Sequence, residues 1–266
     1  MPAALLLLAM AIFVPLVGGQ EIGVRDAPAY TAASIVNAAD NQPGPLAPNT
    51  IGSLYGRGLS YTTKALAPTD IAGGRLPFLL PGTGVTVLIG GEPANLYYVS
   101  PTQINFLVPA NLLPGKSDLQ VVLNGLAGPD VPLQIAASAP ALFQVDAQTI
   151  IATRANGSLT TAASPAHPGD LLIVYATGLG DTNPPVVYSS VSATAAPLKR
   201  IAEFRIVLDG TPIDPKLIAY AGIAPGYAGL YQINFYLPQD AGPNPQLQIG
   251  FDTLSPPQLT IPVATQ

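Results

Sequence analysis

The sequence contains no cysteine. This absence excludes zinc–thiolate sites, iron–sulfur clusters, thiol nucleophiles and disulfide bonds. It is compatible with an oxidising compartment, where an unpaired thiol would be a liability.

Charge is also scarce, because only 9% of the residues are charged against about 25% in an ordinary globular protein. The net charge is −5, and Lys199-Arg200 is the one basic pair. A nucleic-acid ligand requires a basic footprint that neutralises phosphates, and an anionic membrane surface requires the same. The composition therefore excludes both as partners.

Catalytic side chains are few. His167 is the single histidine, it precedes Pro168 in an expected loop, and no Gly-x-Ser-x-Gly elbow supplies a nucleophile for it. A glycosidase pair of Glu92 and Asp209 would need the two halves of the chain to face each other, and both residues fall in expected hairpin turns. We therefore expect no enzyme, no catalytic residue and no cofactor.

The carboxylates are scattered, and no Asp-rich calcium loop is present. Two pairs offer oxygen ligands for a weak calcium site, Asp209 with Asp214 and Asp170 with Asp181. The alternative is ordinary turn capping by aspartate, which is the interpretation we prefer. We expect no metal site.

Glycine and proline are abundant, at 26 and 30 residues. They fall between short apolar runs and rarely inside them, as expected for turns between strands. Val85, Val87 and Ile89 alternate with Thr86 and Leu88, as in a strand with one buried face. Gly90-Gly91 follows, and a Gly-Gly pair between two strands predicts a hairpin turn. Outside the N-terminus no window shows a convincing helical stripe, so the sequence predicts an all-β protein.

The N-terminus carries a short apolar run at residues 5–14. The run is too short for a comfortable membrane span and fits the hydrophobic region of a signal peptide cleaved after Gly19. An uncleaved anchor, a misassigned start and a buried first strand are the alternatives. We therefore predict a signal peptide over residues 1–19, no membrane insertion after its cleavage, and a secreted or periplasmic (cell-envelope) location.

The chain repeats itself at long range. Three blocks recur in the same order: residues 48–59 match 168–179, residues 87–93 match 206–212, and residues 103–109 match 232–238. A period this long indicates duplicated whole domains and excludes a solenoid. The second copy carries an insertion around residues 220–229, which we interpret as a site of partner contact.

These features predict two tandem immunoglobulin-like β-sandwiches, because short strands with turn signals at regular spacing are typical of that fold. The first is expected at residues 31–137 and the second at residues 138–266. The joint at residues 136–140 is short and contains Pro140, so the two should touch. An irregular barrel or jelly roll is the alternative.

Four motifs carry a resemblance to a known family. They are Leu54–Leu59, Tyr98–Pro109, Tyr175–Gly180 and Ile223–Phe235. The chain resembles the uncharacterised Solibacter-type C-terminal domain family of exported acidobacterial proteins, over about residues 31–264. Each half also resembles, more distantly, the IPT/TIG branch of immunoglobulin-like domains. The resemblance implies export and a β-sandwich, and it implies no established activity.

Two sets of polar or aromatic residues are candidates for ligand binding. Gln103/Asn105 and Gln232/Asn234 recur in both copies on one strand face, where they could recognise sugar hydroxyls or could tie a neighbouring loop through hydrogen bonds. We prefer the structural role. Tyr220, Tyr227 and Tyr231 could stack on sugars, although core-edge packing explains most such tyrosines.

The function expected from these observations is a non-catalytic exported module for adhesion, scaffolding or protein interaction. The alternative is a carbohydrate-binding module of the cell envelope or extracellular space. The partner would accordingly be an envelope protein or a glycan. A hydrolase using His167 is the third and least favoured hypothesis.

Overall fold

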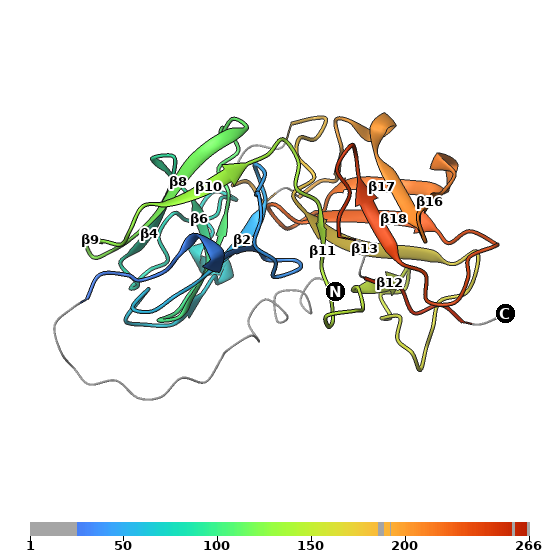
Figure 1. Ribbon diagram of the computed structural model, residues 1–266, viewed down its shortest axis with the longest axis horizontal. Coiled ribbons are helices and arrows are strands. Elements are labelled where there is room, and N and C mark those ends of the chain that lie inside the picture. Colours follow the sequence, from blue (N-terminus) through green and yellow to red (C-terminus); the bar gives the residue numbers. More distant parts are fainter. Residues whose placement is uncertain (1–25, 186–188, 192, 257–258, 265–266) are drawn as a thin grey trace.

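The computed structural model describes residues 26–185, 189–191, 193–256 and 259–264, and it consists of two β-lobes lying side by side (Figure 1). Its helical elements within these ranges are four single turns of 3-10 helix, at Ala32–Ser34, Pro68–Asp70, Ile201–Glu203 and Pro215–Leu217. The predicted all-β class with immunoglobulin-like sandwiches is confirmed. The predicted signal peptide, residues 1–19, lies outside the described residues.

The first lobe is built from two antiparallel sheets. One sheet has the order β1 (Ile35–Asn37), β2 (Ile51–Tyr55), β7 (Gln103–Leu107), β6 (Asn95–Val99) and β3 (Lys64–Ala65). The other has the order β10 (Val131–Ile135), β8 (Gly115–Leu123), β4 (Val85–Ile89) and β5 (Glu92–Pro93), with β9 (Leu126–Ala127) also paired to β8. One buried apolar cluster takes side chains from both sheets, including Leu54, Ile104, Val87 and Val121, so the lobe is a two-layer sandwich.

The second lobe repeats this arrangement. Its larger sheet has the order β11 (Ala141–Leu142), β13 (Leu171–Thr177), β18 (Tyr231–Tyr236), β17 (Ile218–Ile223) and β14 (Ala196–Pro197), with β12 (Ala152–Arg154) also paired to β13. Its smaller sheet has the order β16 (Thr211–Pro212), β15 (Arg205–Leu208) and β19 (Leu247–Gly250). Val174 and Ile233 from the larger sheet pack with Ile206 and Ile249 from the smaller one.

Alternation along the strands explains which faces are buried. In β4, Val85, Val87 and Ile89 are fully buried, whereas the residues between them are half-buried. The following Gly90 and Gly91 both have positive φ, at 60° and 82°. This is the type I′ geometry that suits the twist of a two-residue hairpin, and it explains why β5 folds directly back onto β4.

The blocks that repeat in the sequence pair with their neighbouring strands in the same register in both lobes. Tyr55 pairs with Gln103 across β2 and β7, and Tyr175 pairs with Gln232 across β13 and β18. The hairpins agree as well, because Ile89 pairs with Glu92 just as the matched Leu208 and Thr211 pair in the second lobe. The matched blocks therefore occupy equivalent positions in the two sandwiches.

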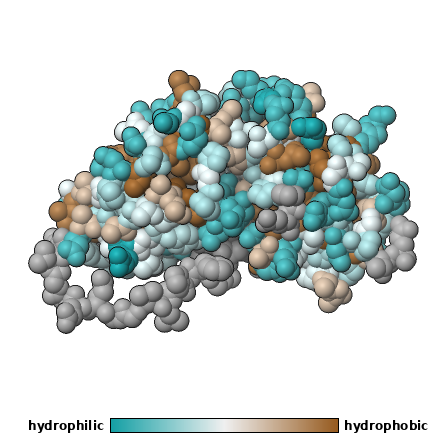
Figure 2. All heavy atoms as spheres, in the orientation of Figure 1, coloured by the Kyte–Doolittle hydropathy of each residue, from teal (hydrophilic) through white to brown (hydrophobic). Residues whose placement is uncertain are grey.

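A third apolar cluster joins the lobes, and we call it the junction. It buries Ala39, Ile51, Leu76, Tyr97 and Leu107 from the first lobe, and Ala141, Phe143, Ile151, Tyr175, Ala224, Ala228 and Leu230 from the second. These side chains come from β2, β6, β7, β11 and β13 and from the segments next to them. The rest of the surface is mixed: on the face drawn in Figure 2, polar residues alternate with scattered apolar ones.

Candidate functional site

Buried hydrogen bonds fix the two lobes across the junction. The Thr177 hydroxyl accepts a hydrogen bond from the Ile51 backbone N–H at 2.9 Å and donates one to the Gly229 carbonyl at 2.8 Å. The Tyr97 hydroxyl donates to the Ala228 carbonyl at 2.5 Å. Because these bonds lie in a dry, apolar cluster, losing one leaves a buried polar group unsatisfied, and the lobes are held in one arrangement.

The predicted insertion at residues 220–229 is part of this junction. Its first residues complete β17, and Ala224 and Ala228 are buried against the first lobe. Gly229 lies so close to Leu107 and to the Asn49 carbonyl that an added Cβ would fall 2.4 Å and 2.7 Å from them. The interpretation of the insertion as a partner-contact loop is therefore corrected: its residues Ala224, Ala228 and Gly229 contact the other half of the same chain.

Beside the junction lies a hollow with a volume of about 520 Å³. We call it the junction groove. It is lined by residues 38–42 after β1, by Ser53, Tyr55 and Gln103 on β2 and β7, and by residues 143–147 after β11. Its walls thus come from both lobes. Its volume falls within the range of about 300–1,000 Å³ that is usual for ligand sites.

A second hollow lies next to the groove, on the second lobe. It has a volume of about 380 Å³ and shares Val145 and Asp146 with the junction groove. Its other walls are Thr149, residues 159–162, Asn244, Thr260 and Pro262. The two hollows therefore have one wall in common, at the exposed Val145 and Asp146.

In the first copy the predicted amide pair belongs to a buried network. Gln103 donates to the Asn105 side-chain oxygen at 2.9 Å, and the Ser53 hydroxyl donates to the same oxygen at 3.0 Å. All three residues are buried. Burial raises the pKa of the neighbouring Tyr55, against an opposing hydrogen bond with Ser53, so the phenol keeps its proton. The network fixes the orientation of the Gln103 side chain, which forms part of the groove wall.

In the second copy the equivalent amides lie elsewhere. Gln232 donates to the Asn234 side-chain oxygen at 2.9 Å, but both residues are only half-buried and neither lines the junction groove. They occupy the outer face of β18, where Asn234 is opposite Tyr220 of β17. The structure therefore does not bring the two predicted amide pairs together in one site.

The three predicted tyrosines are also dispersed. Tyr231 is only 1% exposed and donates to the Gly180 carbonyl, and burial followed by the charge of Asp181 raises its pKa. Its ring belongs to the core, which corrects the expectation that it stacks on a ligand. Tyr227 packs half-buried against the junction, and Tyr220 donates towards the Ile223 carbonyl at 2.7 Å.

The groove contains two carboxylates that sequence reasoning did not single out. Asp40 is 8% exposed, and burial raises its pKa, opposed by a hydrogen bond from the Gln42 backbone N–H at 3.0 Å. Asp146 is exposed, and hydrogen bonds from the Gln148 and Thr149 backbone lower its pKa. No local pattern in the sequence marks Asp40 as a buried carboxylate.

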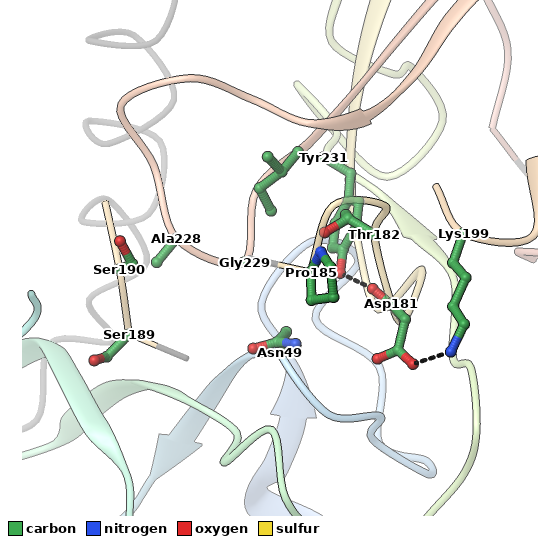
Figure 3. Close-up of a pocket in the computed structure, with 12 residues that line it drawn as sticks. Asn49, Asp181, Thr182, Pro185, Ser189, Ser190, Lys199, Ala228, Gly229 and Tyr231 are labelled. Carbon is green, nitrogen blue, oxygen red and sulfur yellow. Dashed lines mark hydrogen bonds and ion pairs between the residues drawn. The ribbon is translucent and has the colours of Figure 1, made fainter. Parts of the chain in front are cut away.

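A smaller pocket lies on another side of the junction (Figure 3). Asn49 reaches it from the first lobe, and Asp181, Lys199 and the hydroxyl end of Tyr231 reach it from the second. Asp181 and Lys199 pair across its rim at 3.7 Å. Its volume of about 120 Å³ corresponds to only about four water molecules at ~30 Å³ each, so it is too small for most ligands.

The candidate catalytic and metal-binding residues have structural partners. The Asp170 carboxylate caps the turn at His167, accepting from its backbone N–H at 2.9 Å, and pairs with Arg154. Asp209 and Asp214 accept backbone hydrogen bonds from Gln246 and Lys216. Within the described ranges no three His, Cys, Asp or Glu side chains gather where they could hold a metal ion.

Glu92 and Asp209 lie in equivalent hairpins of different lobes, Glu92 in β5 and Asp209 in the β15–β16 turn. The helices of the described residues include none long and apolar enough to cross a membrane.

No protein-family model and no curated protein matches the sequence. Among solved structures, the chain is similar to the Bacteroides ovatus mixed-linkage glucan utilization protein SGBP-B in complex with a heptasaccharide, at 11% identity and a TM-score of 0.35. That alignment covers 83% of this chain and 44% of SGBP-B, so the chain spans less than half of its length.

Two further similar structures are the tandem Ig repeats of Dlar and the Escherichia coli adhesin FdeC. Dlar matches at 11% identity and a TM-score of 0.21, over 91% of this chain and 96% of that one. FdeC matches at 12% identity and a TM-score of 0.24, over 90% of this chain and 66% of the adhesin. Likenesses this weak carry no argument about function, and the fold assignment stands on the strand order and cores described above.

Proposed function

We propose that the protein is a non-catalytic, extracellular or envelope binding module that holds a glycan chain in the junction groove. The observation that carries this proposal is the junction groove itself, a hollow of about 520 Å³ with walls from both lobes, in which Ser53, Gln103 and Asp146 are polar lining residues among apolar ones. Concave hollows of this volume with a few polar groups suit small or chain-like ligands, whereas protein interfaces are broad and flatter.

The chemistry of the walls supports a sugar ligand. Carboxylate and amide oxygens accept hydrogen bonds from sugar hydroxyls, and amide N–H groups donate to them. The half-buried Tyr55 adds an aromatic ring with a neutral hydroxyl. The Gln103 amide is held in place by Asn105 and Ser53, so little side-chain entropy is lost when a ligand docks.

A blocking substitution tests the proposal. Ala147 is exposed and lines the groove, so Ala147→Trp fills the space that a sugar would occupy. Ala127→Trp, on the exposed strand β9 away from the groove, adds the same bulk elsewhere and serves as the control. A panel of immobilised oligosaccharides, both neutral and amine-bearing, should retain the wild type and Ala127→Trp but lose Ala147→Trp. Retention of no oligosaccharide by the wild type, or undiminished binding by Ala147→Trp, would refute the proposal.

A protein partner is the second candidate, and a different surface favours it. Phe78, Leu79 and Leu113 of the first lobe are exposed to 44, 49 and 83%. Phe78 also lines an apolar hollow of about 360 Å³ with Pro93 and Pro109. Exposed apolar groups of this kind are typical of contact surfaces.

Replacing Phe78 and Leu113 with serine should abolish any protein partner that copurifies from envelope extract, and it should leave oligosaccharide binding unchanged. If the same substitutions removed sugar binding instead, the glycan would bind at the apolar surface and the groove would not be the site.

A further inference from the structure

Asp40 is a buried carboxylate without a positively charged neighbour. The residue is 8% exposed, and its Oδ1 accepts a hydrogen bond from the Gln42 backbone N–H at 3.0 Å. The ion pairs formed among the described residues use other carboxylates, those of Asp70, Asp170, Asp181, Glu203 and Asp252. Buried carboxylates are normally paired with a cation, because an isolated buried charge is costly.

The surroundings of Asp40 supply no cation from any side. The described residues that line the junction groove include no lysine, arginine or histidine, and their other titratable groups are Asp146 and Tyr55. Asp146 adds a second negative charge across the groove, and Tyr55 stays neutral because burial raises its pKa. The groove therefore has negative potential and repels sulfated, phosphorylated or uronic-acid ligands.

The position of Asp40 keeps this carboxylate within reach of a ligand. It follows β1 in a tight turn that is closed by a hydrogen bond from the Asn41 N–H to the Asn37 carbonyl at 2.9 Å, with Asn41 at a φ of 57°. The turn presents Asp40 on the groove wall. The backbone bond to Gln42 orients the carboxylate before a ligand arrives.

From these observations we infer that the junction groove selects glycans that carry a protonated amine, an amino-sugar chain, and that Asp40 is the counter-ion for one amine. This inference rests on the proposed glycan-binding function and narrows it. An ammonium group satisfies the carboxylate oxygens with charge-assisted hydrogen bonds, which are about twice as strong as neutral ones. An N-acetyl group at the same position offers one neutral N–H and no charge.

The test compares two ligands of equal length, a glucosamine hexamer and its fully N-acetylated form. Binding is measured by calorimetry at slightly acid pH, where the amines are protonated, at low salt and with a chelator that removes divalent metals. The wild type should bind the amine hexamer about tenfold or more tightly than the acetylated one, the minimum expected from one charge-assisted hydrogen bond.

Asp40→Asn is nearly isosteric and retains an oxygen for the Gln42 N–H, so it should keep the fold while losing this preference. Asp240→Asn removes the same charge from an exposed site on the second lobe and should keep the preference. Asp146→Asn should keep most of it. A circular-dichroism spectrum and a cooperative thermal transition like those of the wild type show that Asp40→Asn is folded.

The possible outcomes separate the inference of amine selectivity from the proposed glycan-binding function. If the wild type binds both hexamers equally, or if Asp40→Asn retains the preference, the inference is overturned while the glycan-binding function stands. A preference that disappears with Asp146→Asn but survives Asp40→Asn also overturns it. If the wild type binds neither hexamer, the inference and the proposed function fail together for this class of sugar.

Discussion

The Tyr97 hydroxyl, on β6 of the first lobe, donates a hydrogen bond to the Ala228 carbonyl, in the turn before β18 of the second lobe. The two residues are separated by 131 positions in the chain, and both are buried in the junction. This contact ties the two sandwiches together across the junction. It also makes the geometry of the junction groove dependent on contacts outside the groove itself.

Tyr97→Phe removes this hydroxyl and changes nothing else in the side chain. The Ala228 carbonyl then stays buried without its partner, so we expect the free energy of unfolding to fall by about 1–3 kcal/mol. Urea denaturation measures the change. Tyr236→Phe, at an exposed tyrosine of β18, is the control and should change stability by less than about 0.5 kcal/mol. Equal effects of the two substitutions would mean that the Tyr97 bond does not stabilise the junction.

Gly229 and Gly226 provide a matched test of whether the insertion at residues 220–229 packs against the first lobe. Both have positive φ, at 66° and 86°, so alanine at either position is strained by about 1–2 kcal/mol. Only at Gly229 would the new methyl group collide with the first lobe, whereas nothing lies within 4 Å at Gly226.

We therefore expect Gly229→Ala to cost about 1–3 kcal/mol more than Gly226→Ala, as overpacking of a buried site does. Thermal denaturation of both variants measures the difference. Similar losses would indicate that the turn is a free loop after all.

Gln103 and Gln232 occupy equivalent positions in the two lobes, but they should contribute different amounts to the free energy of unfolding. Gln103 is 4% exposed and belongs to a network with Asn105 and Ser53. Gln232 makes the same bond to Asn234 on a half-buried face.

Gln103→Ala leaves buried hydrogen-bonding groups unsatisfied and should cost about 1–3 kcal/mol, whereas Gln232→Ala should cost at most about 1 kcal/mol because water replaces the lost bond. Chemical denaturation compares the two. A larger loss for Gln232→Ala would show that burial does not set the importance of these amides.

Much of the sandwich fold was predictable because local rules determine it. The alternation of Val85, Val87 and Ile89 identifies the buried face of β4, and Gly90-Gly91 identifies the turn that follows. The matched blocks then predicted a second lobe with the same ladder, which the pairs of Tyr55 with Gln103 and Tyr175 with Gln232 confirm.

Most of the candidate site could not be predicted from the sequence, because it is formed by contacts between the two lobes. Alternation shows that Ile51 and Leu107 lie on the outer faces of their strands, but it does not show that another domain covers those faces. Tyr231, by contrast, shares one face of its strand with Ile233 and Phe235, so the alternation of the sequence already indicated that its ring is buried. Of the predicted binding residues, Gln103 lies in the junction groove. Asp40 was missed because no local pattern distinguishes a buried turn aspartate from an exposed one.

The burial of Asp40 also predicts how the free energy of unfolding depends on pH. Burial raises its pKa in the folded protein above the ordinary value of 3.8, so between these two values the folded state holds a proton that the unfolded state has released. In that window the free energy of unfolding therefore falls as the pH rises. At neutral pH the ionised, buried carboxylate destabilises the fold, and Asp40→Asn should be more stable than the wild type.

The advantage of Asp40→Asn should shrink as the pH falls through the raised pKa, and it should vanish below the ordinary value, where the wild-type carboxyl is protonated in both states. Other carboxylates, such as Asp70 and Asp146, have lowered pKa values and weaken both proteins equally in acid. The difference between the two melting temperatures across the pH range therefore isolates Asp40. An advantage that is constant with pH, or a loss of stability at neutral pH, would show that the buried carboxylate carries no charge penalty, and the argument for a cationic ligand would lose its physical basis.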